Sequence, residues 1–392
     1  MKGVSQNALR VTALTGVAAT VIAALIAWRS PVAAALREGR PVTGILFGTD
    51  WVDHACHSDT LLWWRYDPAD SRLDILSIPR DTHVDVPGYR FRRINEVFAY
   101  HFARTRNDAV ASEALREAVA DRLGIKGTPL EPRYTLHVDY DGFRRFVDRA
   151  GGIRVHVDET MQYDDNAGNL HIHYDPGEYL LSGQKALEYV RFRGKSGDRG
   201  RILRQVDFLR AVMEKVVSPE TFLRWPGLVS SVAASIRANF SWRDILCLAL
   251  ETKHLRPERV TPAILPGNPR GAEWVVDPER LSYMMAQWGG RPVADSPAAG
   301  LSAKKITVKV RNGTGRPGLA LTATHRLRAA GFDVVDWGDY NARQVKTRVW
   351  DRVGTIENAR KVAQALGTDF VLSDLDATLR TDVEVVLGDD YQ

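Results

Sequence analysis

The chain has 392 residues, which is more than a typical single core holds, so we expect two domains with connecting structure. Its 44% apolar and 26% charged residues are ordinary for globular protein and argue against a disordered or fibrous chain. The net charge of +5 suits an anionic ligand but is too small for a nucleic-acid-binding protein, so we expect no nucleic-acid partner.

The first 29 residues contain the membrane candidate of the chain. Residues 11–28 carry no charge and lie between Arg10 and Arg29. We predict that residues 1–29 form a short cytoplasmic tail and a single transmembrane helix, because this uncharged, mainly apolar stretch of 18 residues is longer than the core of a usual signal peptide. A cleaved signal peptide remains the alternative, with a small-residue site at 33–35. Under both interpretations the large C-terminal part is exported.

From residue 42 onward the pattern alternates between strands and helices. We predict strands at 42–47, 61–66 and 73–78, and helices at 95–106 and 112–123. A strand at 134–138, a helix through Phe143 and Val147 that ends at Gly151-Gly152, and a strand at 153–157 follow. The expected fold is an α/β domain with a central sheet and flanking helices.

The segment from 190 to 205 is the densest group of phosphate-binding donors in the chain. The alternation in residues 190–193 predicts a strand with Arg191 and Arg193 on one face. Arg201, Arg204 and Gln205 then fall at i, i+3 and i+4 of a predicted helix. Guanidinium groups match phosphate oxygens in a bidentate way, so the cluster indicates a phosphoester site. A solvated basic face with ion pairs is the alternative.

The second half of the chain divides at a linker. Helical segments rich in tryptophan and leucine end near Trp288, and residues 289–303 have linker composition. Beyond them we predict a small α/β domain at 304–390. Its expected elements are strands at 306–310 and 332–335, helices at 319–330 and 356–366, and strands near Phe370 and Val383.

Three shorter polar stretches extend the candidate site. Asp50 ends the first strand and Asp59 begins the second, so both carboxylates are expected at one rim of the sheet, where they could hold Mg²⁺. The alternative is that both are turn or cap residues. Arg80 and Asp81 follow a buried strand, and Arg93 precedes a helix. Each could also be an ordinary surface residue.

Taken together, these motifs occur in one recognisable order. They are Gly48 with Asp50, Ser58-Asp59-Thr60, residues 77–81, Arg93 with Asn95, Gly151-Gly152-Ile153, residues 180–187, residues 190–193, and Asp198 with Arg201, Arg204 and Gln205. The region resembles the LytR-CpsA-Psr family, with core motifs over 42–217 in a domain of 41–288. Residues 304–390, with Asn312-Gly313-Thr314-Gly315, resemble the small C-terminal domain often attached to these proteins.

The resemblance implies a membrane-anchored, extracytoplasmic phosphotransferase of the cytoplasmic (inner) membrane. Such an enzyme moves a glycopolymer from a polyprenyl pyrophosphate carrier onto cell-wall peptidoglycan with formation of a phosphodiester, with a pyrophosphatase side activity. Its cofactor would be Mg²⁺, held by Asp50 and Asp59. The residues expected to be catalytic are Arg80, Arg191 and Arg193, and those expected to bind substrate are Arg93, Arg201, Arg204 and Gln205. No residue matches a general base of the family pattern; Asp81 is taken as the catalytic candidate for that role, with Asp53 as the alternative.

The chain also departs from the family pattern. An arginine common after the first aspartate is missing from residues 51–54, and His57 replaces an arginine common before Ser-Asp-Thr. This loss of positive charge motivates an alternative function, a non-catalytic envelope protein that binds prenyl-pyrophosphate-linked glycan. A third hypothesis, a membrane-bound transcription regulator, is disfavoured by the modest charge and the lack of a helix-turn-helix pattern.

Overall fold

The computed structural model describes residues 30–52, 55–86, 88–165, 170–192, 194, 197–217, 236–252, 255–256, 259–289, 305–376, 379 and 381–392. The predicted membrane segment, Arg193 and almost all of the predicted linker lie outside these residues. Among the helices that the structure does describe, none is both long and apolar enough to span a bilayer. The predicted N-terminal anchor is therefore not confirmed.

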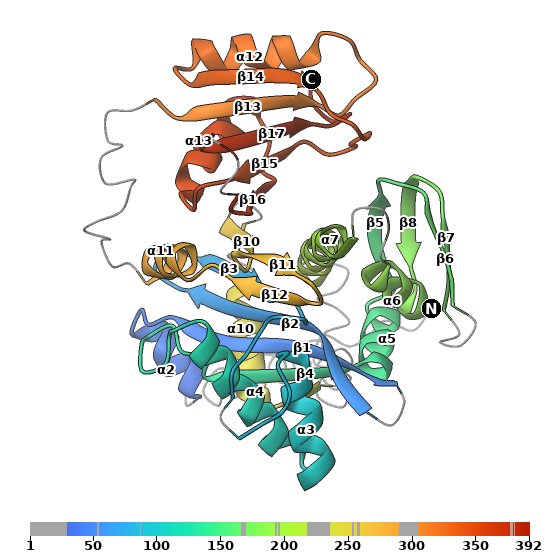
Figure 1. The fold of residues 1–392 in the computed structure, drawn as a ribbon, viewed down its shortest axis with the longest axis vertical. Coiled ribbons are helices and arrows are strands. Elements are labelled where there is room, and N and C mark those ends of the chain that lie inside the picture. Colours follow the sequence, from blue (N-terminus) through green and yellow to red (C-terminus); the bar gives the residue numbers. More distant parts are fainter. Residues whose placement is uncertain are drawn as a thin grey trace, which may run out of the picture.

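A mixed sheet forms the centre of the first domain (Figure 1). Its strand order is β9-β4-β1-β2-β3-β10, in which β1 pairs antiparallel with β2 and parallel with β4. The strands are β1 (Val42–Val52), β2 (Ala55–Asp67), β3 (Arg72–Ser77), β4 (Tyr134–Asp139), β9 (Ile236–Ala238) and β10 (Val260–Ile264). The predicted central sheet is thus confirmed and is mixed, and β1 and β2 are longer than expected.

Helices cover both faces of this sheet, because alternate strand residues are apolar on both sides. Phe47 and Trp63 pack into a core with the helices α3 (Asn95–Thr105), α4 (Asp108–Arg122) and α11 (Pro278–Trp288). Leu46 and Leu62 lie in a separate cluster that reaches Leu209 on the opposite side. α2 (Pro31–Arg37) packs on α10 (Trp242–Thr252) beside the start of β1.

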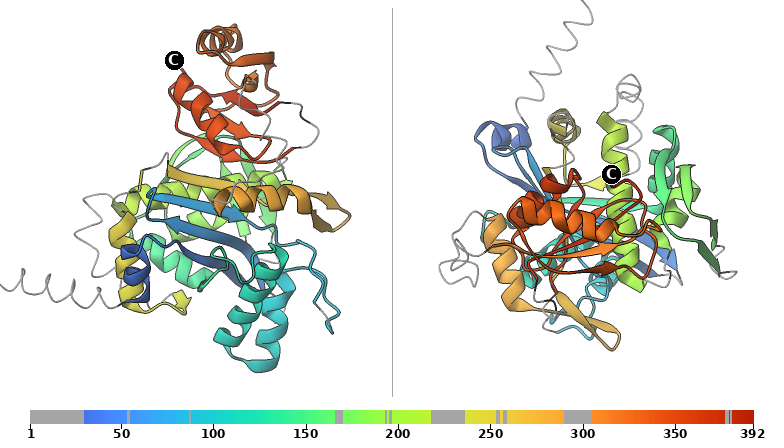
Figure 2. Two further views of the ribbon diagram at one scale, coloured as in Figure 1. Left: turned by 90° about the vertical axis from the view of Figure 1, so that its left-hand side faces the viewer. Right: turned by 90° about the horizontal axis from the view of Figure 1, so that it is seen from above.

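A side lobe stands against the second face of the sheet (Figures 1 and 2). Its core is formed by residues of helices and hairpins between 143 and 212. The helices are α5 (Tyr140–Arg149), α6 (Gly183–Arg191) and α7 (Gly197–Val217). The hairpin strands are β5 (Ile153–Val157), β6 (Met161–Asp165), β7 (Leu170–Tyr174) and β8 (Gly177–Leu181).

A second α/β domain follows, with its own core. Its helices α12 (Leu319–Ala329) and α13 (Ile356–Leu366) accompany the strands β13 (Thr307–Asn312), β14 (Asp333–Asp339), β15 (Arg348–Asp351), β16 (Val371–Ser373) and β17 (Val383–Leu387). A single residue pair, Ala263 with Ser373, joins β10 to β16 and makes the two sheets continuous. Figure 1 shows this domain stacked on the end of the first domain that carries β10 and α7.

Two expectations about secondary structure are wrong. Residues 190 and 191 form the last turn of α6 rather than a strand, because four alternating residues cannot outweigh the helical pattern that begins at Gly183. Between Pro257 and Trp288 we expected only helix, yet β10 and the hairpin β11 (Gly267–Arg270) with β12 (Glu273–Val276) occur there. The strands β6, β8, β9 and β15 were also missed.

A network of polar contacts connects β1, β4, β9 and α4. The Oγ1 of Thr49 lies 2.7 Å from Nε2 of His137, and Nδ1 of His137 lies 2.6 Å from Asp108. The His137 ring stacks on Phe47, with centroids 4.6 Å apart. Arg237 of β9 also pairs with Asp108, at 3.1 Å. These contacts therefore fix the strands β1, β4 and β9 and the helix α4 relative to one another.

The contacts of Asp108 in this network predict a pH-dependent contribution to the stability of the fold. Burial alone raises the pKa of Asp108, but the hydrogen bond and charge of His137, with those of Arg237, outweigh burial and lower it. A carboxyl whose folded pKa is below its unfolded value of about 3.9 stabilises the fold above that pH, and the contribution is lost as pH falls through the folded pKa. We expect Asp108→Asn to cost about 1 kcal/mol at pH 6, and the cost to shrink at pH 3.5. Urea unfolding at both pH values measures it; an equal cost at both would contradict this assignment.

Candidate phosphate-binding and lipid-binding cavity

A cavity of about 490 Å³ lies between the sheet and the helices α5, α6 and α7. Its polar lining residues are Thr60, Arg80, Tyr140, Tyr163, Arg191, Arg201 and Gln205. Its apolar lining includes Leu46, Leu62, Phe143, Phe146, Phe208 and Val212. The cavity thus combines three arginines with a wall of aromatic and aliphatic side chains.

The arginines come from three separate elements. Arg80 lies in the turn after β3, Arg191 is the last residue of α6, and Arg201 lies near the start of α7. The Arg191 guanidinium sits over the ring of Tyr140, 4.9 Å from its centroid. Arg201 is 6% exposed, so its charge is presented inside the cavity and not to bulk water. The resulting group of fixed cations suits a phosphate ligand.

Hydrogen bonds fix the elements that carry these arginines. The side-chain amide of Gln205 donates to Oγ1 of Thr60 on β2 at 3.2 Å and to the carbonyl of Val190 at 3.3 Å. In the Arg80 turn, the N–H of Thr82 donates to the carbonyl of Pro79 at 2.9 Å, and Oγ1 of Thr82 donates to the same oxygen. α7 is therefore tied to β2 and α6, and the Arg80 turn is closed on itself.

The cavity changes character along its length. On α7 the lining residues run from Arg201 and Gln205 to Phe208 and Val212. At 1.5 Å per residue, this series covers about 16 Å of helix. Phe143 of α5 contacts Phe208 of α7, with ring centroids 5.4 Å apart, in the apolar part of the lining. Along α7 the lining of the cavity therefore changes from cationic to apolar.

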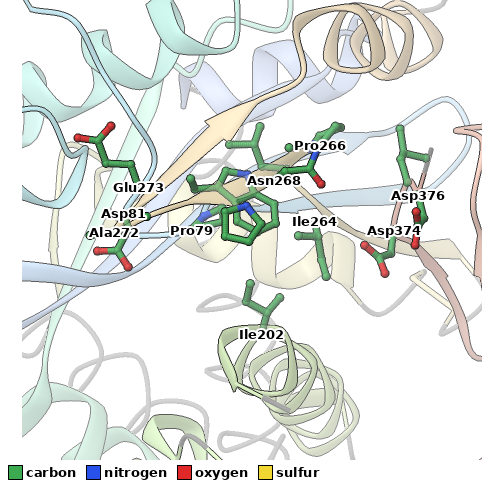
Figure 3. Close-up of a pocket in the computed structure, with 16 residues that line it drawn as sticks. Pro79, Asp81, Ile202, Ile264, Pro266, Asn268, Ala272, Glu273, Asp374 and Asp376 are labelled. Carbon is green, nitrogen blue, oxygen red and sulfur yellow. The ribbon is translucent and has the colours of Figure 1, made fainter. Parts of the chain in front are cut away.

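The structure brings together four of the predicted residues, Arg80, Arg191, Arg201 and Gln205. Asp81 lines a neighbouring cavity of about 530 Å³, together with Glu273, Ile202 and Asp374 (Figure 3). Its carboxylate is 3.7 Å from Arg80 on one side and 3.7 Å from Arg93 on the other.

Two predicted arginines lie apart from the cavity. Arg93 pairs with Glu96 at 3.1 Å and lines neither of the two cavities described above. Arg204 is 9% exposed; it donates to Glu159 at 3.0 Å and to the carbonyl of Phe192 at 2.8 Å. Although Arg204 is three residues from Arg201, it faces a different cavity, between α7 and the C-terminal domain. Arg193 falls outside the described residues.

For the two predicted metal ligands, the structure describes the backbone positions. Asp50 lies on β1 two residues after Gly48, and Asp59 lies on β2 directly before Thr60. Gly48 and Thr60 are paired and both line the cavity, and the register shifts between Gly48 and Thr49. The side chains of Asp50 and Asp59 lie outside what the structure describes. Both positions are next to the cationic cavity.

The family resemblance implied an apolar groove for the prenyl chain, but no individual residue of the apolar lining was identified from sequence. Tyr140, Phe143 and Phe146 share one side of α5, but this pattern is equally typical of a helix that packs on a core. The signal that could have found them is the aromatic excess on a short helix directly after β4. Sequence alone does not separate a filled core from a hollow one.

Curated proteins match part of this chain in sequence. The chain is 26% identical over 185 residues to "Regulatory protein MsrR" of Staphylococcus aureus (strain COL), which covers 46% of this chain and 51% of that protein. It is 24% identical over 223 residues to "Polyisoprenyl-teichoic acid--peptidoglycan teichoic acid transferase TagU" of Enterococcus faecalis (strain V583), over 55% of this chain and 67% of that protein. The match to MsrR thus spans about half of the relative's length.

Solved structures share the fold. The structure of TagV from B. subtilis superposes with a TM-score of 0.53 at 22% identity, over 65% of this chain and 99% of that chain. A LytR-Csp2A-Psr enzyme from Actinomyces oris gives a TM-score of 0.50 at 20% identity, over 67% and 92%. The family model of the LytR_cpsA_psr family matches residues 27–287, and that of the LytR cell envelope-related transcriptional attenuator matches residues 305–391. The chain therefore belongs to the LytR-CpsA-Psr family.

Proposed function

We propose that this chain is a phosphotransferase that moves a glycopolymer from a polyprenyl pyrophosphate carrier to peptidoglycan. One observation carries the proposal: a single cavity is lined both by Arg80, Arg191 and Arg201 and by an apolar wall that includes Phe143 and Phe208. A lipid pyrophosphate has the same polarity, with several negative charges next to a hydrocarbon chain. Burial of the isoprenoid tail and pairing of the phosphates with guanidinium groups would together position the donor.

The chemistry assigned to these residues is positioning and charge neutralisation. The acceptor hydroxyl oxygen attacks the phosphorus that bears the glycopolymer, the bond from that phosphorus to the bridging oxygen breaks, and polyprenyl phosphate leaves with the electron pair. The hydroxyl proton passes to a base, for which Asp81 beside Arg80 is the candidate. Phosphoryl transfer needs little covalent help, so fixed arginines near the transferred group are the main catalytic element.

A magnesium ion fits the residues next to the cavity. Carboxylate oxygens are ligands that Mg²⁺ prefers, and Asp50 and Asp59 lie on paired strands beside Gly48 and Thr60. When bound, the ion would supply further charge neutralisation at the pyrophosphate. We propose Asp50 and Asp59 as its protein ligands.

The names of relatives support the same function. TagU of Enterococcus faecalis is named as a transferase of teichoic acid from a polyisoprenyl carrier to peptidoglycan. For this chain we propose the general class, a glycopolymer transferase anchored at the cytoplasmic membrane by residues 1–29, and leave the polymer open. A protein that binds the lipid-linked glycan without transferring it is the competing function.

A transfer assay with a matched control tests the proposal. The full chain is given a prenyl pyrophosphate-linked saccharide, peptidoglycan fragments and Mg²⁺, and phosphodiester-linked product is measured by mass spectrometry. We expect Arg191→Gln to lower turnover by about 100-fold, because Arg191 lines the cavity. Arg149→Gln, an exposed site on α5, is expected to keep parental turnover. Tight donor binding without product in the parent would favour the competing function.

A further inference from the structure

Two opposite sides of helix α7 make different contacts, one with the proposed donor cavity and one with the C-terminal domain. Its residues Arg201, Gln205, Phe208, Leu209 and Val212 line the proposed donor cavity. Its residues Leu203, Asp207 and Arg210 contact the C-terminal domain. Because an α-helix turns by about 100° per residue, the two sets lie on opposite faces. The element that presents two ligand-binding residues is thus held from behind by another domain.

A buried ion pair is the centre of this contact. Nη2 of Arg348, at the start of β15, lies 2.7 Å from Asp158 and 3.1 Å from Asp207. The three side chains are between 10% and 22% exposed. Asp158 directly follows β5 and Asp207 is on α7, so one guanidinium joins the C-terminal domain to two elements of the side lobe. Removing one member of such a group leaves charge buried without its counter-ion.

Packing surrounds the ion pair. The Arg210 guanidinium lies over the ring of Phe370, 4.1 Å from its centroid, and donates to the carbonyl of Val371 at 3.4 Å. Leu203 packs against a cluster that includes Trp350 and Phe370. The contact therefore combines charge, stacking and apolar burial along the back of α7.

Three contacts that do not involve α7 hold the C-terminal domain against the first domain. β16 pairs with β10, the Arg360 guanidinium donates to Thr261 at 2.5 Å, and the hydroxyl groups of Tyr283 and Thr355 lie 3.1 Å apart. Figure 3 shows Asp374 and Asp376 of this domain lining the same cavity as Ile202 of α7. The C-terminal domain is thus placed independently of α7, so it can act as a fixed support for that helix.

We propose that the C-terminal domain positions α7 for ligand binding, and that Arg348 is the positioning residue that sets the helix through Asp207. The identity of the ligand rests on the proposed function, whereas the support of α7 does not. Rotation or shift of α7 would move Arg201 and Gln205 relative to Arg80 and Arg191, which belong to other elements. Arg348 thereby acts on the donor site without touching it.

The test uses the full chain with Arg348→Gln, the conservative Arg348→Lys, and Arg343→Gln as the matched control. Arg343 belongs to the same domain and also pairs with an aspartate, Asp389 at 3.1 Å, but its side chain is 74% exposed. Hydrogen–deuterium exchange is measured on peptides covering 197–217, and binding is measured with a short-chain prenyl pyrophosphate. Melting curves are recorded for every variant, so that binding is compared among folded proteins.

We expect Arg348→Gln to raise exchange in α7 and to weaken binding of the prenyl pyrophosphate, each by about tenfold. Arg348→Lys should recover part of both, and Arg343→Gln should match the parent. Parental exchange and affinity in folded Arg348→Gln would overturn the inference. Should that variant not fold, Arg210→Gln, which leaves the ion pair in place, must show the same two changes. If the unmutated protein binds no prenyl pyrophosphate, the proposed function is refuted. In that case the exchange rates of α7 in the variants still test whether the C-terminal domain supports this helix.

Discussion

Replacement of Arg201 by glutamine is expected to lower turnover by about 10²–10³-fold while the fold is retained. Arg201 is 6% exposed and lines the cationic end of the cavity, so its charge acts where water does not screen it. Glutamine keeps hydrogen-bonding capacity but removes the permanent charge. The loss should appear in kcat, since neutralisation matters most when charge develops on the transferred phosphoryl group. Steady-state kinetics of the transfer reaction measures it.

Arg204→Gln is the matched control on the same helix. Arg204 is similarly buried, at 9% exposure, but it pairs with Glu159 and the carbonyl of Phe192 outside the cavity. We therefore expect it to lower the melting temperature more than the turnover of the folded protein. Equal losses of turnover per folded molecule in the two variants would show that the cavity assignment of α7 is incorrect.

The largest expected effect on stability comes from Arg65 on β2. Its guanidinium lies 2.9 Å from Asp74 on β3 and also pairs with Asp67 at 2.5 Å. The Asp74 side chain is fully buried, and Arg72 at 3.2 Å would be its remaining partner. We expect Arg65→Met to lower the free energy of unfolding by about 3 kcal/mol, because it leaves a buried carboxylate under-compensated. Urea unfolding followed by intrinsic fluorescence measures the change.

An exposed ion pair provides the comparison for Arg65. Arg40 and Glu38 lie 2.6 Å apart, but both side chains are more than half exposed. Exposed pairs contribute about 0–1 kcal/mol, so Arg40→Met should unfold almost as the parent does. If both variants lost the same free energy, burial would not be the cause.

Much of the fold could be predicted from local patterns. The alternation that marks β4, the left-handed glycines that end α5 and α13, and the periodicity of α4 are all encoded within a few residues. β10 was missed because Pro262 lies within it and its residues are buried on all sides, so no alternation is visible. β15 is four buried residues long and has no alternation either. Such strands are determined by their neighbours.

The residues of the site that could be predicted are those that lie within short sequence motifs. Arg191, Arg201 and Gln205 were expected to converge with Arg80, and they line one cavity. Arg204 could not be assigned correctly, since i, i+3 spacing places it at the edge of the helix face, and Glu159 of another loop decides its direction. The contact between Arg348 and Asp207 joins residues 141 positions apart, which no local pattern reveals.

Photo-crosslinking tests the central claim most directly. A short-chain prenyl pyrophosphate with a photoreactive group on its isoprenoid end is bound to the full chain, irradiated, and the labelled peptides are identified. The account predicts labels on the apolar wall, at Phe143, Phe146, Phe208 or Val212. Labelling should be displaced by unlabelled prenyl pyrophosphate and reduced in Arg201→Gln. Labels elsewhere, or labelling that neither competitor nor variant reduces, would contradict a cavity that binds both ends of the lipid carrier.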